Sequence, residues 1–113
     1  KKEIIVNLGG DNISPSKIEN LLCLNEKIKQ SFVFGDKKTF LVALIVSDSD
    51  ENENEIQHYV ENLNKNLSIV EKIKKFKLIK NEFTIENRML TPTLKLKRKN
   101  ILEKYKEDLE KLY

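Results

Sequence analysis

The stretch Phe40-Leu41-Val42-Ala43-Leu44-Ile45-Val46 is apolar at every position, and the prediction of the fold starts from it. A short run without polar alternation is typical of a central strand whose two faces are both covered. Gly35-Asp36-Lys37-Lys38 comes shortly before it and predicts a turn between strands over 28–34 and 39–47. We therefore expect a small sheet with helices on both of its faces.

A second turn signal, Gly9-Gly10-Asp11-Asn12, lies near the start of the chain. Gly and Asn tolerate positive φ, so this signal predicts a hairpin between short strands over 4–8 and 12–14. Ser14 can then cap a helix with Pro15 at its first position, where the missing N–H costs nothing. The helix is expected to end near Asn25. Its buried stripe is predicted to comprise Ile18, Leu21 and Leu22.

The second half of the chain alternates helical and strand-like patterns. An acidic loop over 47–55 leads into a helix, and its carboxylates favour the positive end of the helix dipole. Apolar residues then repeat at helical spacing: Ile56, Tyr59, Val60, Leu63 and Leu67. A capping-box pattern over 68–71 predicts another short helix through Lys75. The apolar residues over 76–79 then predict a strand, which continues irregularly to Phe83 and Ile85. A last helix from about Lys99 buries one stripe: Ile101, Leu102, Tyr105, Leu109 and Leu112. The element order β-β-α-β-β-α-α-β-α indicates an α+β fold.

Composition limits the function classes. A length of 113 residues fits one domain, and no apolar run approaches the roughly 20 residues of a membrane span. The chain starts at Lys1, directly before a strand-like run and without a signal-peptide pattern, so we expect a fragment of a longer protein. Cys23 is the only cysteine, which excludes an internal disulfide and favours the cytoplasm. The net charge of +3 comes from 19 Lys against 2 Arg, which argues against a nucleic-acid partner.

Few residues are candidates for chemistry. His58 is the only histidine, so a histidine metal cluster cannot be built, and we predict no metal site. Cys23 ends an apolar helical stripe and is predicted to be buried and inert. No glycine-rich phosphate loop with Lys-Ser/Thr is present. Lys95 follows Pro92, which fixes φ, and a lysine held in such a segment can deliver a point charge to a phosphate or carboxylate.

Three stretches together resemble the C-terminal domain of adenylate-forming enzymes, specifically of long-chain fatty-acid–CoA ligases. The first runs from Lys2 to Glu19 and contains Gly-Gly-Asp-Asn-Ile-Ser-Pro. The second is Phe32-Val33-Phe34-Gly35-Asp36 with the apolar run that follows it. The third is Leu90-Thr91-Pro92-Thr93-Leu94-Lys95-Leu96-Lys97-Arg98. Many relatives have Gly directly before the lysine of this third stretch, where this chain has Leu94.

The resemblance implies a small mixed sheet covered by helices, preceded by a short β-hairpin, with residues 1–113 forming one C-terminal lid domain. A fatty acid and ATP-Mg²⁺ would give an acyl-adenylate, which CoA would convert to acyl-CoA and AMP. Lys95 is implied as the adenylation lysine, and Gly9 and Gly10 as part of the CoA-binding face. The hinge falls at Lys2 or Glu3, with Lys2 favoured. The chain's own N-terminal adenylation domain would hold ATP, Mg²⁺ and the fatty acid, and the whole enzyme could associate peripherally with the inner face of a membrane.

Two other functions remain open from the residues themselves. Gly9-Gly10 is also what a plain hairpin turn requires, and Lys95 is one of 19 lysines. Basic residues over 72–80 and 95–99 could belong to a small nucleic-acid-binding module, or the chain could be a protein-interaction domain.

Overall fold

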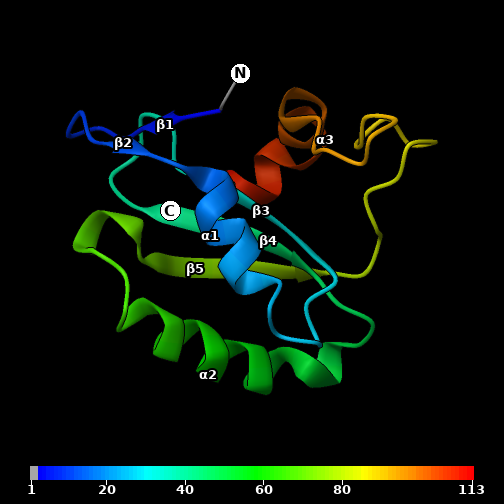
Figure 1. Ribbon diagram of the computed structural model, residues 1–113, viewed down its shortest axis with the longest axis horizontal. Helices are drawn as coiled ribbons and strands as arrows, with labels where there is room; N and C mark the ends of the chain where they lie inside the picture. Colours follow the sequence, from blue (N-terminus) through cyan, green and yellow to red (C-terminus); the bar gives the residue numbers. More distant parts are fainter. Residues whose placement is uncertain (1–2) are drawn as a thin grey trace.

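The computed structural model describes residues 3–113 and confirms the α+β class (Figure 1). A two-stranded hairpin, β1 (Ile5–Val6) and β2 (Asn12–Ile13), comes first. The main sheet follows, with the order β3–β4–β5. Its strands are β3 (Gln30–Phe34), β4 (Leu41–Val46) and β5 (Ile73–Ile79). The helices are α1 (Pro15–Leu22), α2 (Glu53–Asn64) and α3 (Arg98–Glu110), with 3-10 turns at Asp50–Asn52 and Ile69–Glu71.

The apolar run occupies the centre of the sheet, as predicted. All six residues of β4 are buried, because β3 pairs antiparallel and β5 parallel along its two edges and helices cover both faces of the sheet. Side chains alternate along a strand, so successive β4 residues contribute to two different cores. The first core packs α1 and α2 on one face of the sheet, through Ile18, Leu22, Ile56 and Val60. The second packs α3 on the other face, through Ile101, Tyr105 and Leu109.

The start of α1 follows the predicted signals in part. Pro15 is the first helical residue, and Ser14 has the extended backbone of an N-cap residue. The Ser14 hydroxyl makes no capping bond, however, and instead lies 3.3 Å from Ser16 Oγ. Within the stripe Ile18 and Leu22 are fully buried, whereas Leu21 is only partly covered.

The predicted helix through Lys75 is wrong. Ser68 and Glu71 do interact, since the Ser68 N–H and Oγ donate to Glu71 Oε1 at 3.3 and 2.9 Å, but helical geometry stops at Glu71. The chain is extended from Lys72, and β5 begins at Ile73, which is 1% exposed. Pairing with β4 and burial of Ile73 outweigh the local capping signal, because a capped turn stabilises the chain by only about 1 kcal/mol.

The segment between β5 and α3 contains no strand of its own. Phe83 is buried against α3, whereas Ile85 is 44% exposed, so the strand does not continue irregularly as predicted. Gln30 holds the segment at its start: Gln30 Nε2 donates to the Phe83 carbonyl at 2.9 Å, and the Phe83 N–H donates to Gln30 Oε1 at 2.7 Å. None of the helices formed by residues 3–113 is long and apolar enough to cross a bilayer.

Candidate functional site

Lys95 lies in a tight, hydrogen-bonded loop that immediately precedes α3. The Thr91 N–H donates to the Lys95 carbonyl at 2.8 Å, and the Lys95 N–H donates to Thr91 Oγ1 at 3.0 Å. The Leu94 N–H closes the turn on the Thr91 carbonyl at 2.8 Å. Just outside these bonds, Leu90 and Leu96 pair as an antiparallel bridge. The backbone on both sides of Lys95 is therefore held in one shape while the Lys95 side chain is exposed.

Leu94 has a backbone conformation that explains why glycine suits this position. Its φ is +65°, in the left-handed region, and its side chain is 65% exposed. A residue with a Cβ pays about 1–2 kcal/mol to adopt this conformation, and glycine does not. The Leu94 backbone is therefore strained, and the little burial of this residue does not offset the strain.

Replacing Leu94 with glycine is expected to leave the free energy of unfolding unchanged or to raise it by up to about 1 kcal/mol, because relief of strain exceeds the loss of an exposed side chain. Leu94→Val should lower it, since a β-branched residue tolerates positive φ poorly. Urea denaturation of the 113-residue chain measures both variants. A clear loss of stability in Leu94→Gly would contradict this account.

The buried Glu19 and the half-buried Arg98 form an ion pair next to this loop, and sequence reasoning missed it. Arg98 Nη1 and Nη2 donate to Glu19 Oε2 and Oε1, both at 2.7 Å, and Glu19 is 6% exposed. Glu19 Oε2 also accepts the Val33 N–H at 2.8 Å. A sequence signal existed: Glu19 lies on the buried face of α1 between Ile18 and Leu22, where an unpaired carboxylate would be costly.

Gly9 and Gly10 form the tip of the β1–β2 hairpin, and they have different requirements. Gly10 has φ +87°, so a side chain there would be strained. Gly9 has no such φ, and a Cβ on it would meet only Asp11 Oδ2 at 3.6 Å and Asn7 Oδ1 at 3.7 Å. The turn thus explains Gly10, whereas nothing within residues 3–113 explains the absence of a side chain at Gly9.

The hairpin is attached to the turn between β3 and β4. The Leu8 N–H donates to the Lys38 carbonyl at 2.9 Å, and the Lys37 N–H donates to the Val6 carbonyl at 2.8 Å. The C-terminus holds the same turn from another side, because Lys38 pairs with Glu110 at 2.7 Å and Tyr113 stacks on Phe40. Figure 1 shows the hairpin tip at one end of the longest axis, while the segment between β5 and α3 extends to the other end before it returns to α3. Among residues 3–113, no hydrogen bond joins Gly9 or Gly10 to Lys95.

Cys23 and His58 both lie on the surface, as predicted for His58 but not for Cys23. Cys23 is exposed rather than buried, because it follows the last residue of α1 and falls outside the packed stripe. Its Sγ lies 3.5 Å from Ser31 Oγ, and partial desolvation raises the pKa of the thiol. His58 is exposed on α2, as expected. The favoured hinge residue, Lys2, lies outside the residues that the structure describes.

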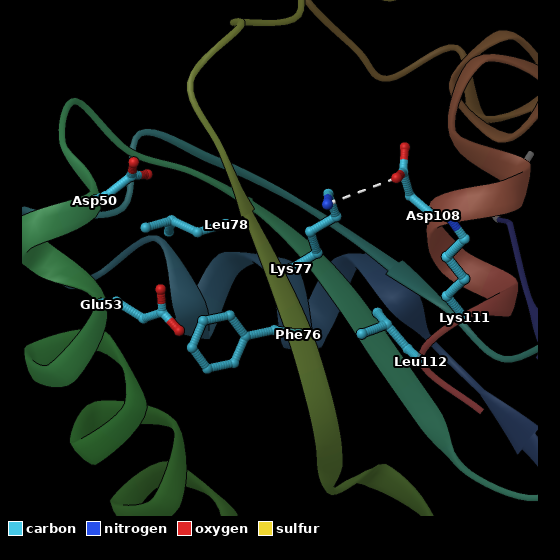
Figure 2. Close-up of a pocket in the computed structure, with 8 residues that line it drawn as sticks. All are labelled: Asp50, Glu53, Phe76, Lys77, Leu78, Asp108, Lys111 and Leu112. Carbon is cyan, nitrogen blue, oxygen red and sulfur yellow. Dashed lines mark ion pairs between the residues drawn. The ribbon is translucent and has the colours of Figure 1, made fainter.

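Two pockets on the described surface are lined by other residues, and neither contains Lys95, Gly9 or Gly10. Figure 2 shows the larger one, about 330 Å³, along the outer edge of β5, where Lys77 pairs with Asp108 at 3.6 Å. The smaller one, about 210 Å³, lies between β1, β3 and α3 and is lined partly by Phe32 and Arg98. Among residues 3–113 no group of three or more His, Cys, Asp or Glu side chains is placed to hold a metal ion. The two predicted functional segments are thus exposed features that enclose no ligand on their own.

The fold and the two segments define a C-terminal domain of AMP-binding enzymes. Residues 2–113 match the family described as "AMP-binding enzyme C-terminal domain", and the chain belongs to that family.

Its relatives are acyl ligases. The long-chain-fatty-acid–CoA ligase FadD15 of Mycobacterium tuberculosis is 35% identical in sequence to this chain. The alignment covers the whole chain and 23% of that relative. A second relative is the chloroplastic long-chain-fatty-acid–[acyl-carrier-protein] ligase AEE15 of Arabidopsis thaliana, at 28% sequence identity. That alignment covers 99% of this chain and 17% of the relative. The chain therefore spans less than a quarter of the length of these curated relatives.

A solved structure supports the same assignment. The adenylation domain of a carboxylate reductase from Mycobacterium chelonae superposes with a TM-score of 0.85 at 26% identity. The superposition covers 97% of this chain and 19% of that one. The predicted α+β fold and the predicted family are both confirmed.

Proposed function

We propose that this chain is the C-terminal lid domain of a long-chain fatty-acid–CoA ligase, and that it supplies Lys95 to the adenylation step. The observation that carries the proposal is the rigid Thr91–Lys95 loop, which fixes the backbone of one exposed lysine and leaves its ammonium free to reach a partner surface. The ligase names printed for the relatives support the choice of reaction.

Lys95 would act by electrostatics. When the carboxylate of a fatty acid attacks the α-phosphate of ATP, negative charge develops on the phosphate oxygens as the bond to pyrophosphate breaks. A lysine ammonium is a compact point charge, and in a water-poor site its stabilisation of such charge is worth several kcal/mol. Residues 3–113 offer no donor set for Mg²⁺, so we assign Mg²⁺ and most ATP contacts to the adenylation domain.

The hairpin would serve the second step. CoA thiol attack on the acyl-adenylate carbonyl forms the thioester and releases AMP. Gly9 and Gly10 present bare backbone at an exposed tip, which a thin pantetheine arm could approach closely. Within residues 3–113, Lys95 and the hairpin tip share no hydrogen bond and line no common pocket, so serving both steps would require a rotation of the domain between them, about a hinge that we place at Lys2. The thiol could instead be an acyl-carrier protein, as the Arabidopsis relative's name states for that enzyme.

Complementation tests the proposal. An adenylation domain truncated before its own lid should make acyl-CoA from a fatty acid, ATP and CoA only when this chain is fused to its C-terminus. The matched control is the same fusion carrying Lys95→Ala. Binding of the chain to the truncated domain without turnover would instead support a protein-interaction module, and steeply salt-dependent binding to nucleic acid would support the basic-module alternative.

A further inference from the structure

The ion pair between Glu19 and Arg98 lies across the outer edge of the sheet, next to β3. β3 is an edge strand, so its outward N–H groups have no strand to bond with. Glu19 Oε2 accepts one of these, the Val33 N–H, at 2.8 Å, and the Ser31 hydroxyl donates to the Glu19 carbonyl at 3.2 Å. Arg98 reaches the same carboxylate from α3, which packs on the opposite face of the sheet from α1.

This pair sets the position at which the chain leaves the Lys95 loop. Arg98 is the first residue of α3 and comes three positions after Lys95. The entry to the loop is held separately by the buried residues Met89 and Leu90, and the Lys97 N–H donates to the Met89 carbonyl at 2.8 Å. The bidentate bond of Arg98 therefore fixes the second end of a short segment whose first end is already anchored.

We propose that Glu19 and Arg98 are positioning residues for the Lys95 ammonium, acting through the α3 start and without contact to substrate. The inference rests on the proposed function of Lys95. Two parallel N–H···O bonds define direction as well as distance, which a single ammonium cannot do. A lysine that must meet a developing charge loses effect when it is displaced by about 1 Å, which can cost on the order of a hundredfold in rate.

A purely structural role is the competing explanation. Buried ion pairs often contribute little net stability, and removing one partner destabilises the fold by leaving the other charge unpaired. A structural defect would depress every activity of the lid to a similar degree, whereas a positioning defect would fall on the step that uses Lys95. The two half-reactions therefore separate the explanations.

The test uses Arg98→Lys and Glu19→Gln, which avoid a large cavity. Arg98→Lys keeps the positive charge but loses the pair of parallel hydrogen bonds to the Glu19 carboxylate. Glu19→Gln keeps an acceptor for the Val33 N–H. The matched control is Lys17→Gln, at another residue of α1, which breaks the surface pair between Lys17 and Glu71. All variants are made in the full-length enzyme that contains this chain, and in the 113-residue chain itself.

In the full-length enzyme, Arg98→Lys should slow adenylation at least about tenfold and largely spare thioester formation from supplied acyl-adenylate. In the 113-residue chain, amide hydrogen exchange at Leu94, Lys95 and Lys97 should accelerate while exchange in α2 stays as in the wild type. Lys17→Gln should change neither readout.

Equal loss of both half-reactions in Arg98→Lys, or unchanged exchange in the loop, would overturn the positioning role. Global acceleration of exchange, α2 included, would show that the pair is structural and would overturn it too. If Lys95→Ala impairs adenylation selectively while Arg98→Lys does not, the inference fails and the proposed function stands. If Lys95→Ala itself is not selective, the proposed function fails, whatever the exchange data show.

Discussion

Replacing Lys95 with alanine in the full-length enzyme is expected to lower the adenylation rate by about 10²–10³-fold, because a preorganised charge on the reacting phosphate is lost. Thioester formation from supplied acyl-adenylate should be largely spared, since the lysine would face away from the active site in that step. Lys95 is exposed, so the fold should not suffer. Pyrophosphate exchange measures the first half-reaction, and acyl-CoA formation from synthetic acyl-adenylate measures the second.

Lys97→Ala is the matched control for this variant. Lys97 is an exposed lysine two positions along the chain, and only its backbone is used to anchor the loop. A general effect of positive charge near the loop would slow both variants alike. Comparable loss of both half-reactions in Lys95→Ala would remove Lys95 from the assigned role.

The opposite pattern is expected at the hairpin. Gly9→Leu should slow thioester formation by about tenfold or more and leave adenylation nearly unchanged, because a side chain at the tip would obstruct the approach of pantetheine. The change is structurally mild within this chain, since the added Cβ has ordinary contacts and Gly9 does not need positive φ. Gly10 is a poorer site for the test, because its φ of +87° makes any side chain strained. Rates of thioester formation measured at varied CoA concentration should show the defect as a higher KM for CoA.

Gly9→Ala provides a graded comparison, with a smaller expected effect than leucine. Asn66→Leu adds the same side chain at an exposed position after α2 and should leave both half-reactions intact. If Gly9→Leu reduced adenylation and thioester formation equally, or neither, the hairpin would be only a turn, which is the plainer explanation of its two glycines.

Much of the fold could be predicted from local patterns. The apolar run became the buried central strand, and helices cover both faces as expected. The approximate places of α1, α2 and α3 followed from Pro15, from the acidic loop and from helical spacing. These features depend on short-range chemistry: turn conformation, helix starts and the burial of continuous apolar surface.

The errors came where packing overrides local preference. The capping signal at Ser68 and Glu71 was real, yet pairing with β4 drew the chain into a strand at Ile73. Cys23 followed an apolar stripe in sequence, yet α1 ends before it and leaves it exposed. In the first case a contact with a distant strand decided the outcome, and no window of neighbouring residues contains that contact.

The sequence by itself determined the central strand, the hairpin and the lysine loop, because runs, turns and prolines act within a few residues. Only the tertiary structure decided that Glu19 and Arg98, 79 positions apart, meet over the free edge of β3. That meeting requires α1 and α3 to pack on opposite faces of one sheet, with Glu19 in the middle of α1 and Arg98 at the start of α3 both reaching the edge of β3. It also gives a buried carboxylate the partners without which its burial would be prohibitive.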